Sequence, residues 1–332
     1  MTSTPAPSVA VRPAHHGLRP WLRRLGVLAG HTFTQLVRMK VFYFLLVFSL
    51  IMFVAGFVLS SVSPDAELKL VKDTSFGVMQ IFSALFGIVG MALLLPKDIE
   101  DRTLYTILSK PVRRYEYLLG KYCGVLLVLL VSLAIMHLMA CAVLHVKYTG
   151  AVADETQGLQ AAVEAGKLTP ADLPQVRAEA MEKLSRQGIQ PDLHMAVLAI
   201  FLKAAVITAV AMAVSTFAGS TIFTLLATLS IYVIGHLQAD ARETLLAPAP
   251  VAQHAPAGEA APAPRPPSVP LRLASGLVAV LFPDFQVFNV VDAVVSGKPL
   301  AWSAIGKMFG LSALYLSIYL GVSIFLFAEK EL

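Results

Sequence analysis

The sequence predicts an all-α membrane protein with about six transmembrane helices, and three observations support this fold class. The chain has 332 residues, of which 57% are hydrophobic, and its mean hydropathy is +0.71. Only 14% of the residues are charged, whereas soluble domains usually carry about 25%. Several apolar runs reach about 20 residues, the length that a helix needs to cross the hydrocarbon core. The class is therefore a polytopic integral membrane protein.

The residues before the first apolar run divide into two parts. Residues 1–19 are rich in Pro, Ala, Ser and Thr and have no apolar period, so we expect a disordered cytoplasmic tail. Between 20 and 40, apolar residues recur at helical spacing among basic ones. This pattern predicts an amphipathic helix in the membrane interface. A cytoplasmic extension of the first transmembrane helix is the alternative.

Six apolar runs are the expected transmembrane helices, and the fifth is the shortest. They cover residues 41–60, 76–95, 122–145, 195–217, 221–237 and 303–327. The chain then divides into three helices with a charged segment between the second and third, two further helices, and a last helix with a short tail. These parts are residues 41–146 with the segment 96–121, residues 195–237, and residues 303–332.

Lysine and arginine near the ends of the runs predict the orientation. Six of them precede the first run and six lie in 96–121, whereas the 61–75 loop has two. Loops rich in Lys and Arg stay on the cytoplasmic side. We therefore expect the N-terminus and segment 96–121 to be cytoplasmic. Six crossings then return the C-terminus to the cytoplasm.

Two long segments are expected outside the cytoplasm. Segment 147–194 is predicted to hold an amphipathic helix that starts at Thr169 and Pro170 and stops near Gly188. Segment 238–302 contains an Ala/Pro-rich stretch, 245–270, which we interpret as an extended linker. After it, 271–293 includes an apolar run too short to cross the membrane, which favours a re-entrant or interfacial element.

Motifs for catalysis and for metal binding are missing from the sequence. It has no G-x-x-x-x-G-K-[ST] loop, no H-E-x-x-H and no C-x-x-C, so we expect neither ATP hydrolysis on this chain nor a bound metal. His137 and His145 lie about 12 Å apart along one helix, too far to share a metal there. An intramembrane enzyme is a further alternative, and it would use one of these histidines with groups from other helices, or the outward Asp284 and Asp292. The basic residues do not form the stripe that is typical of nucleic-acid binding, so we do not expect that function.

Two lysines fall inside the expected transmembrane runs. Lys203 and Lys307 both lie in the outer half of their helices under this topology. Each could extend its ammonium to the outer interface, or could line a substrate path. The six runs contain no Asp or Glu. This argues against an ion-coupled secondary transporter, which usually needs carboxylates near the midplane.

The charged segment 96–121 combines charges with interleaved tyrosines and leucines. Pro96 is expected to end the second transmembrane helix, and the acidic residues from Asp98 to open a short amphipathic helix. Pro111 would end that helix and begin the next one. A solvated basic loop is the alternative, but the apolar side favours a surface that binds a partner or lipid headgroups.

The stretch DIEDRTLYTILSKPVRRYEYLLGKY resembles the signature between the second and third helices of type-2 ABC transporter permeases. The residues that fit it are Glu100, Thr103, Leu104, Leu108, Lys110, Pro111, Val112, Arg114, Tyr117, Gly120 and Lys121. The later stretch LFPDFQVFNVVDAVVSG resembles the element before the last helix in the subgroup associated with multicopper-enzyme maturation. Segment 147–194 and the Ala/Pro-rich insert depart from the family pattern.

The resemblance implies a permease subunit of an exporter-like complex in a bacterial inner membrane. Segment 96–121 would be the coupling element against a separate P-loop ATPase subunit, which binds ATP and Mg²⁺; this chain would bind no cofactor itself. A second permease, identical or different, would complete the transport path. The implied ATPase-contacting residues are Asp98, Glu100, Arg102, Thr103, Leu104, Leu108, Lys110, Pro111, Arg114, Tyr117, Gly120 and Lys121.

A structural membrane anchor is the alternative function. Such a protein would recruit cytoplasmic proteins through the same charged surface and would transport nothing. It would bind its partners without any change that depends on nucleotide. The sequence does not name a cargo, because apolar helices are compatible with lipids, peptides and drugs alike.

Overall fold

The computed structural model describes six ranges of the chain, and every regular element in them is a helix. The ranges are 18–60, 67–100, 113–218, 220–246, 282–298 and 300–329. The all-α prediction is confirmed for these residues. Most of the predicted disordered tail (1–19), the Ala/Pro-rich linker (245–270) and the middle of the charged segment (101–112) lie outside the described residues, as does 271–281.

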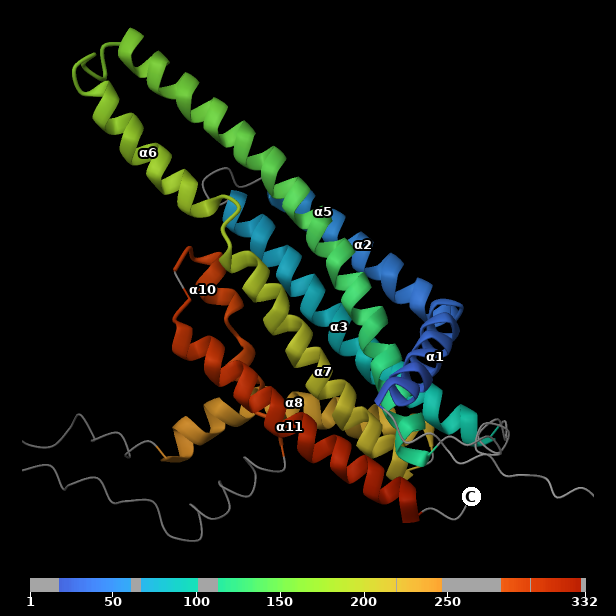
Figure 1. Cartoon of the computed structure of the whole chain (residues 1–332). Helices are drawn as coiled ribbons and strands as arrows, with labels where there is room; N and C mark the ends of the chain where they lie inside the picture. Colours follow the sequence, from blue (N-terminus) through green and yellow to red (C-terminus); the bar gives the residue numbers. More distant parts are fainter. Residues whose placement is uncertain are drawn as a thin grey trace, which may run out of the picture.

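The first two helices meet at a sharp corner. Helix α1 (Leu18–Val37) and helix α2 (Lys40–Ser60) are separated only by Arg38 and Met39. In Figure 1, α1 is seen almost down its own axis while α2, α3 and α5 run across the view. The helix predicted between 20 and 40 is therefore present as α1, and it lies across the bundle, packed on α5.

The bundle is built from long helices around a central α7. These are α2, α3 (Glu67–Glu100), α5 (Arg114–Glu164), α7 (Asp192–Ala218), α8 (Thr221–Leu246) and α11 (Trp302–Glu329). Helix α7 packs against α3, α5, α8 and α11 and is buried along most of its length. Its many alanines let neighbouring backbones approach closely. On α3, a Cβ at Gly87 would lie 2.4 Å from the Thr208 hydroxyl oxygen.

Four described helices are long and apolar enough to cross a membrane: α3, α5, α7 and α11. The chain is therefore a multi-pass membrane protein. Within α8, the apolar part Thr221–Leu237 is shorter. The candidate stretch Leu173–Ala218 contains two helices, α6 (Leu173–Gln187) and α7. The turn at 188–191 separates them.

Both ends of α3 differ from the sequence prediction. Helix α3 starts at Glu67 rather than at 76, and it continues through Pro96 to Glu100. Asp98 and Glu100 therefore belong to the end of this helix, and the prediction that they open a new helix was wrong. Asp101 and Arg102, the other residues of that predicted helix start, lie outside the described residues. A proline inside a helix removes one hydrogen bond, and its ring crowds the carbonyl four residues before it. Pro96 stands near the end of α3, where few turns remain to be disrupted.

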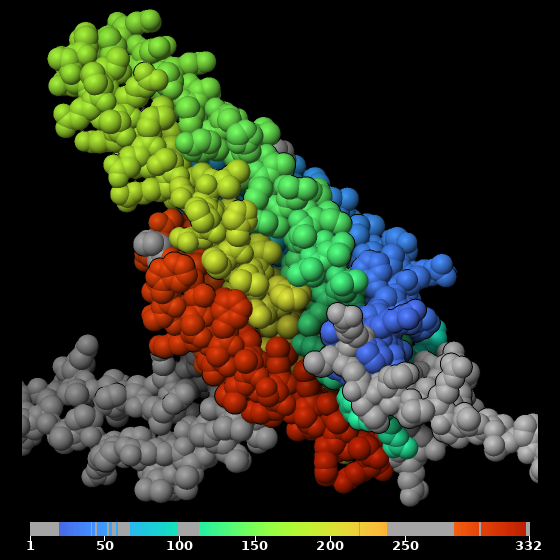
Figure 2. All heavy atoms as spheres, viewed as in Figure 1, coloured from blue at the N-terminus to red at the C-terminus, as the bar shows by residue number. Residues whose placement is uncertain are grey.

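Helices α5 and α6 form a hairpin that projects beyond the other helices (Figures 1 and 2). Helix α5 does not stop at 145 but runs for 51 residues, about 76 Å at 1.5 Å per residue. The chain reverses at Gly166, whose φ is +69°. Helix α6 begins at Leu173 with Asp172 as its N-cap, later than the predicted start at Thr169, and it ends before Gly188 as predicted.

A short buried element precedes the last helix. The 3₁₀ helix η2 (Phe285–Phe288) packs on α7, α8 and α11, and α10 (Val291–Val295) packs on α3 and α7. Phe285 and Phe288 are almost fully buried. A Cβ at Gly235 of α8 would lie 2.5 Å from the Pro283 carbonyl oxygen, so glycine is what permits this close approach.

Candidate functional site

The candidate site lies where α3 ends and α5 begins, which we call the Asp98 end of the bundle. The opposite end, which carries the α5–α6 hairpin, is the hairpin end. The Asp98 end contains both flanks of the segment 101–112, the middle of the predicted coupling region. Helices α1 and α11 also reach it, because α1 crosses the start of α5 and α11 finishes beside it.

A buried ion pair joins the two flanking helices. Lys121 Nζ of α5 lies 2.6 Å from Asp98 Oδ2 of α3, and the two side chains are 4% and 9% exposed. Neighbouring groups complete the hydrogen bonding. The Tyr117 hydroxyl donates to the same carboxylate oxygen at 2.5 Å, and Lys121 also donates to Gln35 Oε1 of α1 at 2.9 Å. Buried charges are tolerated when they are paired and hydrogen-bonded in this way.

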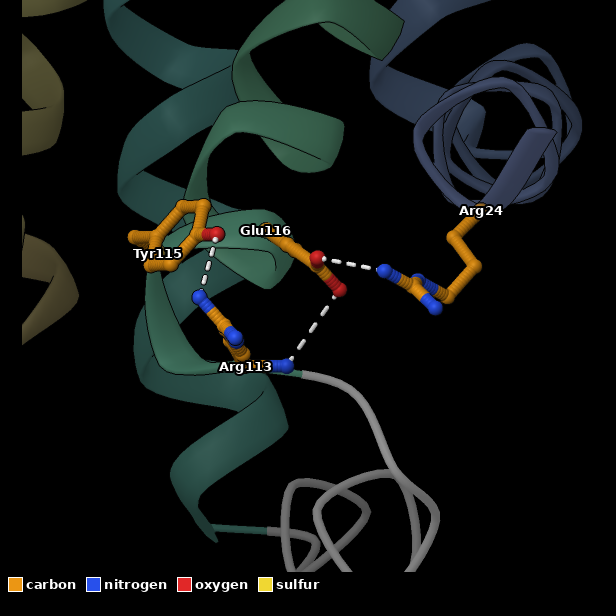
Figure 3. A network of polar contacts seen from close by, with 4 residues as sticks. All are labelled: Arg24, Arg113, Tyr115 and Glu116. Atoms are coloured by element: carbon orange, nitrogen blue, oxygen red, sulfur yellow. Dashed lines mark hydrogen bonds and ion pairs between the residues drawn. The ribbon is translucent and has the colours of Figure 1, made fainter. Parts of the chain in front are cut away.

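Glu116 forms a second link between α1 and the start of α5 (Figure 3). Its buried carboxylate accepts a hydrogen bond from the Arg24 guanidinium of α1, with Nη2 and Oε1 2.9 Å apart. Its other oxygen accepts the backbone N–H of Arg113 at 3.3 Å. This second contact is half of a capping box, in which the third helical residue binds the N-cap backbone. The Glu116 carboxylate therefore caps the N-terminus of α5 and also binds α1 to this helix.

The end of α11 is attached to the same place. Arg114 Nη1 donates to the carbonyl oxygens of Phe327 and Ala328 at 3.3 and 3.0 Å. Cations favour the C-terminal ends of helices, where the carbonyls have no helical partner. The rings of Tyr117 and Phe327 stack, with centroids 6.0 Å apart. The start of α5 therefore contacts α1, α3 and α11 at once.

Two glycines on α5 let α1 approach. A Cβ at Gly120 would lie 2.4 Å from the Leu28 Cβ, and a Cβ at Gly124 would lie 2.4 Å from the Thr32 Cβ and 2.8 Å from the Ala29 carbonyl oxygen. Four residues apart, the two glycines face the same side of α5. This small-xxx-small spacing is a common device for close helix packing in membranes. Gly120 therefore has a packing role here.

The structure brings together five of the residues predicted to contact an ATPase and leaves the others undescribed. Asp98, Arg114, Tyr117, Gly120 and Lys121 all lie at the Asp98 end. Glu100 is the last residue of α3, but its side chain is not described. The remaining predicted residues lie outside the described ranges: Arg102, Thr103, Leu104, Leu108, Lys110 and Pro111.

The two lysines considered for a substrate path lie in different surroundings. Lys203 is buried, and its ammonium donates to Gln80 Oε1 of α3 at 3.3 Å and lies 6.0 Å from the centre of the Tyr232 ring of α8. It thus points between helices and does not extend toward the outer interface. Lys307 is exposed near the start of α11, as expected for a lysine that reaches an interface.

A histidine pair at the hairpin end was not predicted. His137 Nε2 of α5 lies 2.7 Å from His194 Nδ1 of α7, and Cys141 Sγ lies 3.6 Å from His137 Nε2. Within the described ranges, no three His, Cys, Asp or Glu side chains are arranged to hold a metal ion. We therefore interpret the pair as a hydrogen-bonded contact between α5 and α7.

Several residues that build the Asp98 end were missed by sequence reasoning. Arg24 and Gln35 were seen only as part of an amphipathic helix, and Glu116 only as one charge in the segment. The capping-box position of Glu116, three residues after Arg113, was a local signal that could have been found. The partners of Arg24 and Gln35 lie 92 and 86 residues away, and no local signal points to them.

Comparisons with known proteins add no family. No model of a protein family matches the chain, and no curated protein matches it either.

Proposed function

We propose that this chain is the permease subunit of an ABC transporter, driven by a separate ATP-binding subunit that contacts segment 96–121. The proposal combines the resemblance of that segment to type-2 permeases with the construction of the Asp98 end. An exporter in a bacterial inner membrane, with a second permease subunit completing the path, is the form that we favour.

The buried Asp98–Lys121 ion pair is the observation that carries the proposal. It fixes the end of α3 to the start of α5, the two points from which segment 101–112 emerges. A force applied to that segment would therefore move both helices together. Because Lys121 also binds Gln35 and Arg114 binds the end of α11, the same movement would reach α1 and α11. A coupling element needs this kind of connection.

The connectivity supports six crossings, with α2 and α8 added to α3, α5, α7 and α11. Helix α7 starts at the hairpin end and finishes toward the Asp98 end. Val291 and Val294 of α10 pack with Leu68 of α3 and Leu193 of α7, back at the hairpin end. The chain must therefore traverse the bundle between α7 and α10, and α8 is the described helix in that interval. Helix α2 has 21 residues, enough for one crossing.

Six crossings would leave both termini on the cytoplasmic side, together with the Asp98 end. The hairpin and α10 would then face outward. In this arrangement, nucleotide-driven movement of the ATPase would act on the Asp98 end, and the bundle would transmit it along α5 to the outward face. The missing P-loop motif agrees with an energy source on another chain.

The test is an affinity purification of the tagged full chain in mild detergent, with mass spectrometry of the proteins that accompany it and an ATPase assay. We expect a P-loop subunit to co-purify. Replacing residues 103–108 with a Gly/Ser run should abolish this association or uncouple hydrolysis from transport. The matched control is a Gly/Ser replacement of residues 256–261, six residues in the Ala/Pro-rich stretch, which should change neither.

Two results would contradict the proposal. Purification of the chain alone in several detergents, without nucleotide hydrolysis, would argue against an ABC permease. Partners that bind equally with and without nucleotide, and whose binding the 103–108 replacement abolishes, would instead identify the chain as a membrane anchor.

A further inference from the structure

An open cavity lies at the corner between α1, α2 and the end of α3. Its volume is about 430 Å³, and its polar lining residues include His31, Thr34, Arg38 and Lys97. Met39, Leu93 and Leu94 form the apolar part of the lining. The cavity adjoins the Asp98 end, because Gln35, which binds Lys121, is also part of the wall.

The charge of this cavity is positive. Arg38 and Lys97 are both exposed, and within the described ranges neither forms an ion pair with a carboxylate. The nearest described acid, Asp98, follows Lys97 directly, but its carboxylate is directed to Lys121 and Tyr117 inside the bundle. Two cations thus face an open space without a described counterion.

An apolar groove continues from the cavity along α2 and α3. It shares Met39 and Leu93 with the cavity and extends to Phe42 and Val89, with the buried Phe86 beneath them. Its enclosed volume is only about 10 Å³, so a chain lying there would rest on the surface between the helices. The polar cavity and the apolar groove therefore form one continuous amphipathic surface.

We propose that this surface binds an anionic phospholipid. Arg38 and Lys97 hold the phosphodiester, and one acyl chain follows the partly exposed Met39, Phe42 and Val89 along the groove. Basic pockets between membrane helices at the bilayer boundary are suited to anionic headgroups. A soluble anion would use only the charged half of the site, whereas the apolar continuation fits a molecule that carries both parts.

The bound lipid would connect α1 to α3 at the corner where α1 turns into α2. Its headgroup would contact Arg38 after the end of α1 and Lys97 near the end of α3. The site does not depend on the proposed transport function, because it requires only that the α1–α2 corner lies at a membrane surface.

The experiment measures lipid binding to the purified full chain. Delipidated protein is titrated with phosphatidylglycerol or phosphatidylcholine of the same acyl chains, and bound lipid is counted by native mass spectrometry. The variant is Arg38→Gln with Lys97→Gln. With about 1 kcal/mol from each cation near a membrane surface, we expect phosphatidylglycerol to bind about 30-fold more weakly. Phosphatidylcholine binding should not change.

Matched variants separate a site from general surface charge. Arg23→Gln with Lys69→Gln removes the same charge from exposed positions of α1 and α3, away from the cavity, and should retain the preference for phosphatidylglycerol. Arg38→Lys with Lys97→Arg keeps the charge and should also retain it. Because Arg38 and Lys97 are exposed, neither substitution is expected to disturb folding, which circular dichroism of each variant checks.

Three outcomes would overturn the proposal. An equal loss in the Arg23/Lys69 variant would mean that only overall charge matters. Displacement of phosphatidylglycerol by inorganic phosphate at equal concentration would indicate a site for a soluble anion. Unchanged lipid binding in the Arg38/Lys97 variant would mean that these two cations do not hold the lipid. If that variant also lost a co-purifying ATPase subunit, the cavity would be a protein-docking surface.

Discussion

The Asp98 end and the hairpin end share helix α5 but are stabilised in different ways. At the Asp98 end, the side chains of Asp98 and Lys121 are 9% and 4% exposed, and their contacts join α1, α3 and α5. In the hairpin, α6 has no buried residue, and its ion pair between Arg186 and Glu182 is 65–68% exposed. The Asp98 end is held by a buried ion pair between distant segments, whereas the ion pair within α6 is local and exposed.

The difference implies that equal chemical changes should have unequal effects at the two ends. Exposed ion pairs are screened by water and contribute little. A buried pair that loses one partner leaves an uncompensated charge. The outer hairpin should therefore tolerate substitution, while the Asp98 end should not.

The largest effect is expected for Lys121→Met. It leaves the Asp98 carboxylate buried beside Tyr117 without its cation, which should lower the free energy of unfolding by about 3–5 kcal/mol. Chemical unfolding of the full chain in mixed micelles, followed by circular dichroism, measures it. Asp98→Leu combined with Lys121→Met should recover most of the loss, because no unpaired charge remains. A single variant as stable as the parent would show that the pair is not buried.

Gly124→Ala should have the next largest effect. The added Cβ would collide with the Ala29 carbonyl and with Thr32, so α1 must shift, at a cost of about 1–3 kcal/mol. The matched control is Gly158→Ala in the outer part of the same helix, where no atom lies within 4 Å. That change should stabilise the helix by about 0.5–1 kcal/mol. If both substitutions changed the free energy of unfolding in the same direction, the expected difference between the two ends would be contradicted.

Gly166→Val should disturb only the hairpin. Its φ of +69° is unfavourable for a residue with a Cβ, so we expect a local cost of about 1–2 kcal/mol. Hydrogen exchange should become faster in residues 160–175 and stay unchanged around Lys121. Faster exchange throughout α3 and α7 would mean that the hairpin is part of the cooperative bundle.

The smallest effect is expected for Arg186→Gln. Its partner Glu182 lies one helical turn away, and both side chains are largely exposed. The free energy of unfolding should change by less than about 0.5 kcal/mol. Lys121→Met and Arg186→Gln each remove one ion pair from the same protein, and the two pairs differ mainly in burial. The same unfolding measurement compares their contributions.

The limits of the apolar runs predicted the helix boundaries well for three helices of the bundle. Helix α7 covers Asp192–Ala218 against a predicted 195–217, and α11 covers Trp302–Glu329 against 303–327. Here the apolar run and the helix share their ends. The predicted run 41–60 likewise matches α2 (Lys40–Ser60).

The prediction was less accurate where polar residues continue a helix. Lys72 interrupts the apolar pattern, but in the structure it donates to Gln187 at 2.6 Å, so α3 extends past it. Lys147 was placed after the third transmembrane helix, yet it pairs with Glu67 while α5 continues. In both cases the polar side chain has a partner in another helix. A boundary drawn from hydropathy alone cannot include such a partner.

The sequence selected residues of the candidate site, but it did not predict the contacts between them. The charges of segment 96–121 drew attention to Asp98 and Lys121, but their pairing requires the antiparallel packing of α3 and α5. The Gly120 and Gly124 spacing was visible in the sequence. The helix that packs on these glycines is α1, and no local sequence pattern specifies that α1 crosses α5 there.

The uninterrupted length of α5 has a mechanical consequence. Helix α5 packs on α3 and α7 as far as Lys147, which pairs with Glu67, and from there to Glu164 it continues for about 26 Å beside α6. Each degree of tilt about Lys147 would move the tip by about 0.4 Å, by simple geometry on that length. A small rotation that reaches Lys147 along α5 would thus become a larger displacement in the hairpin, as at the end of a lever arm.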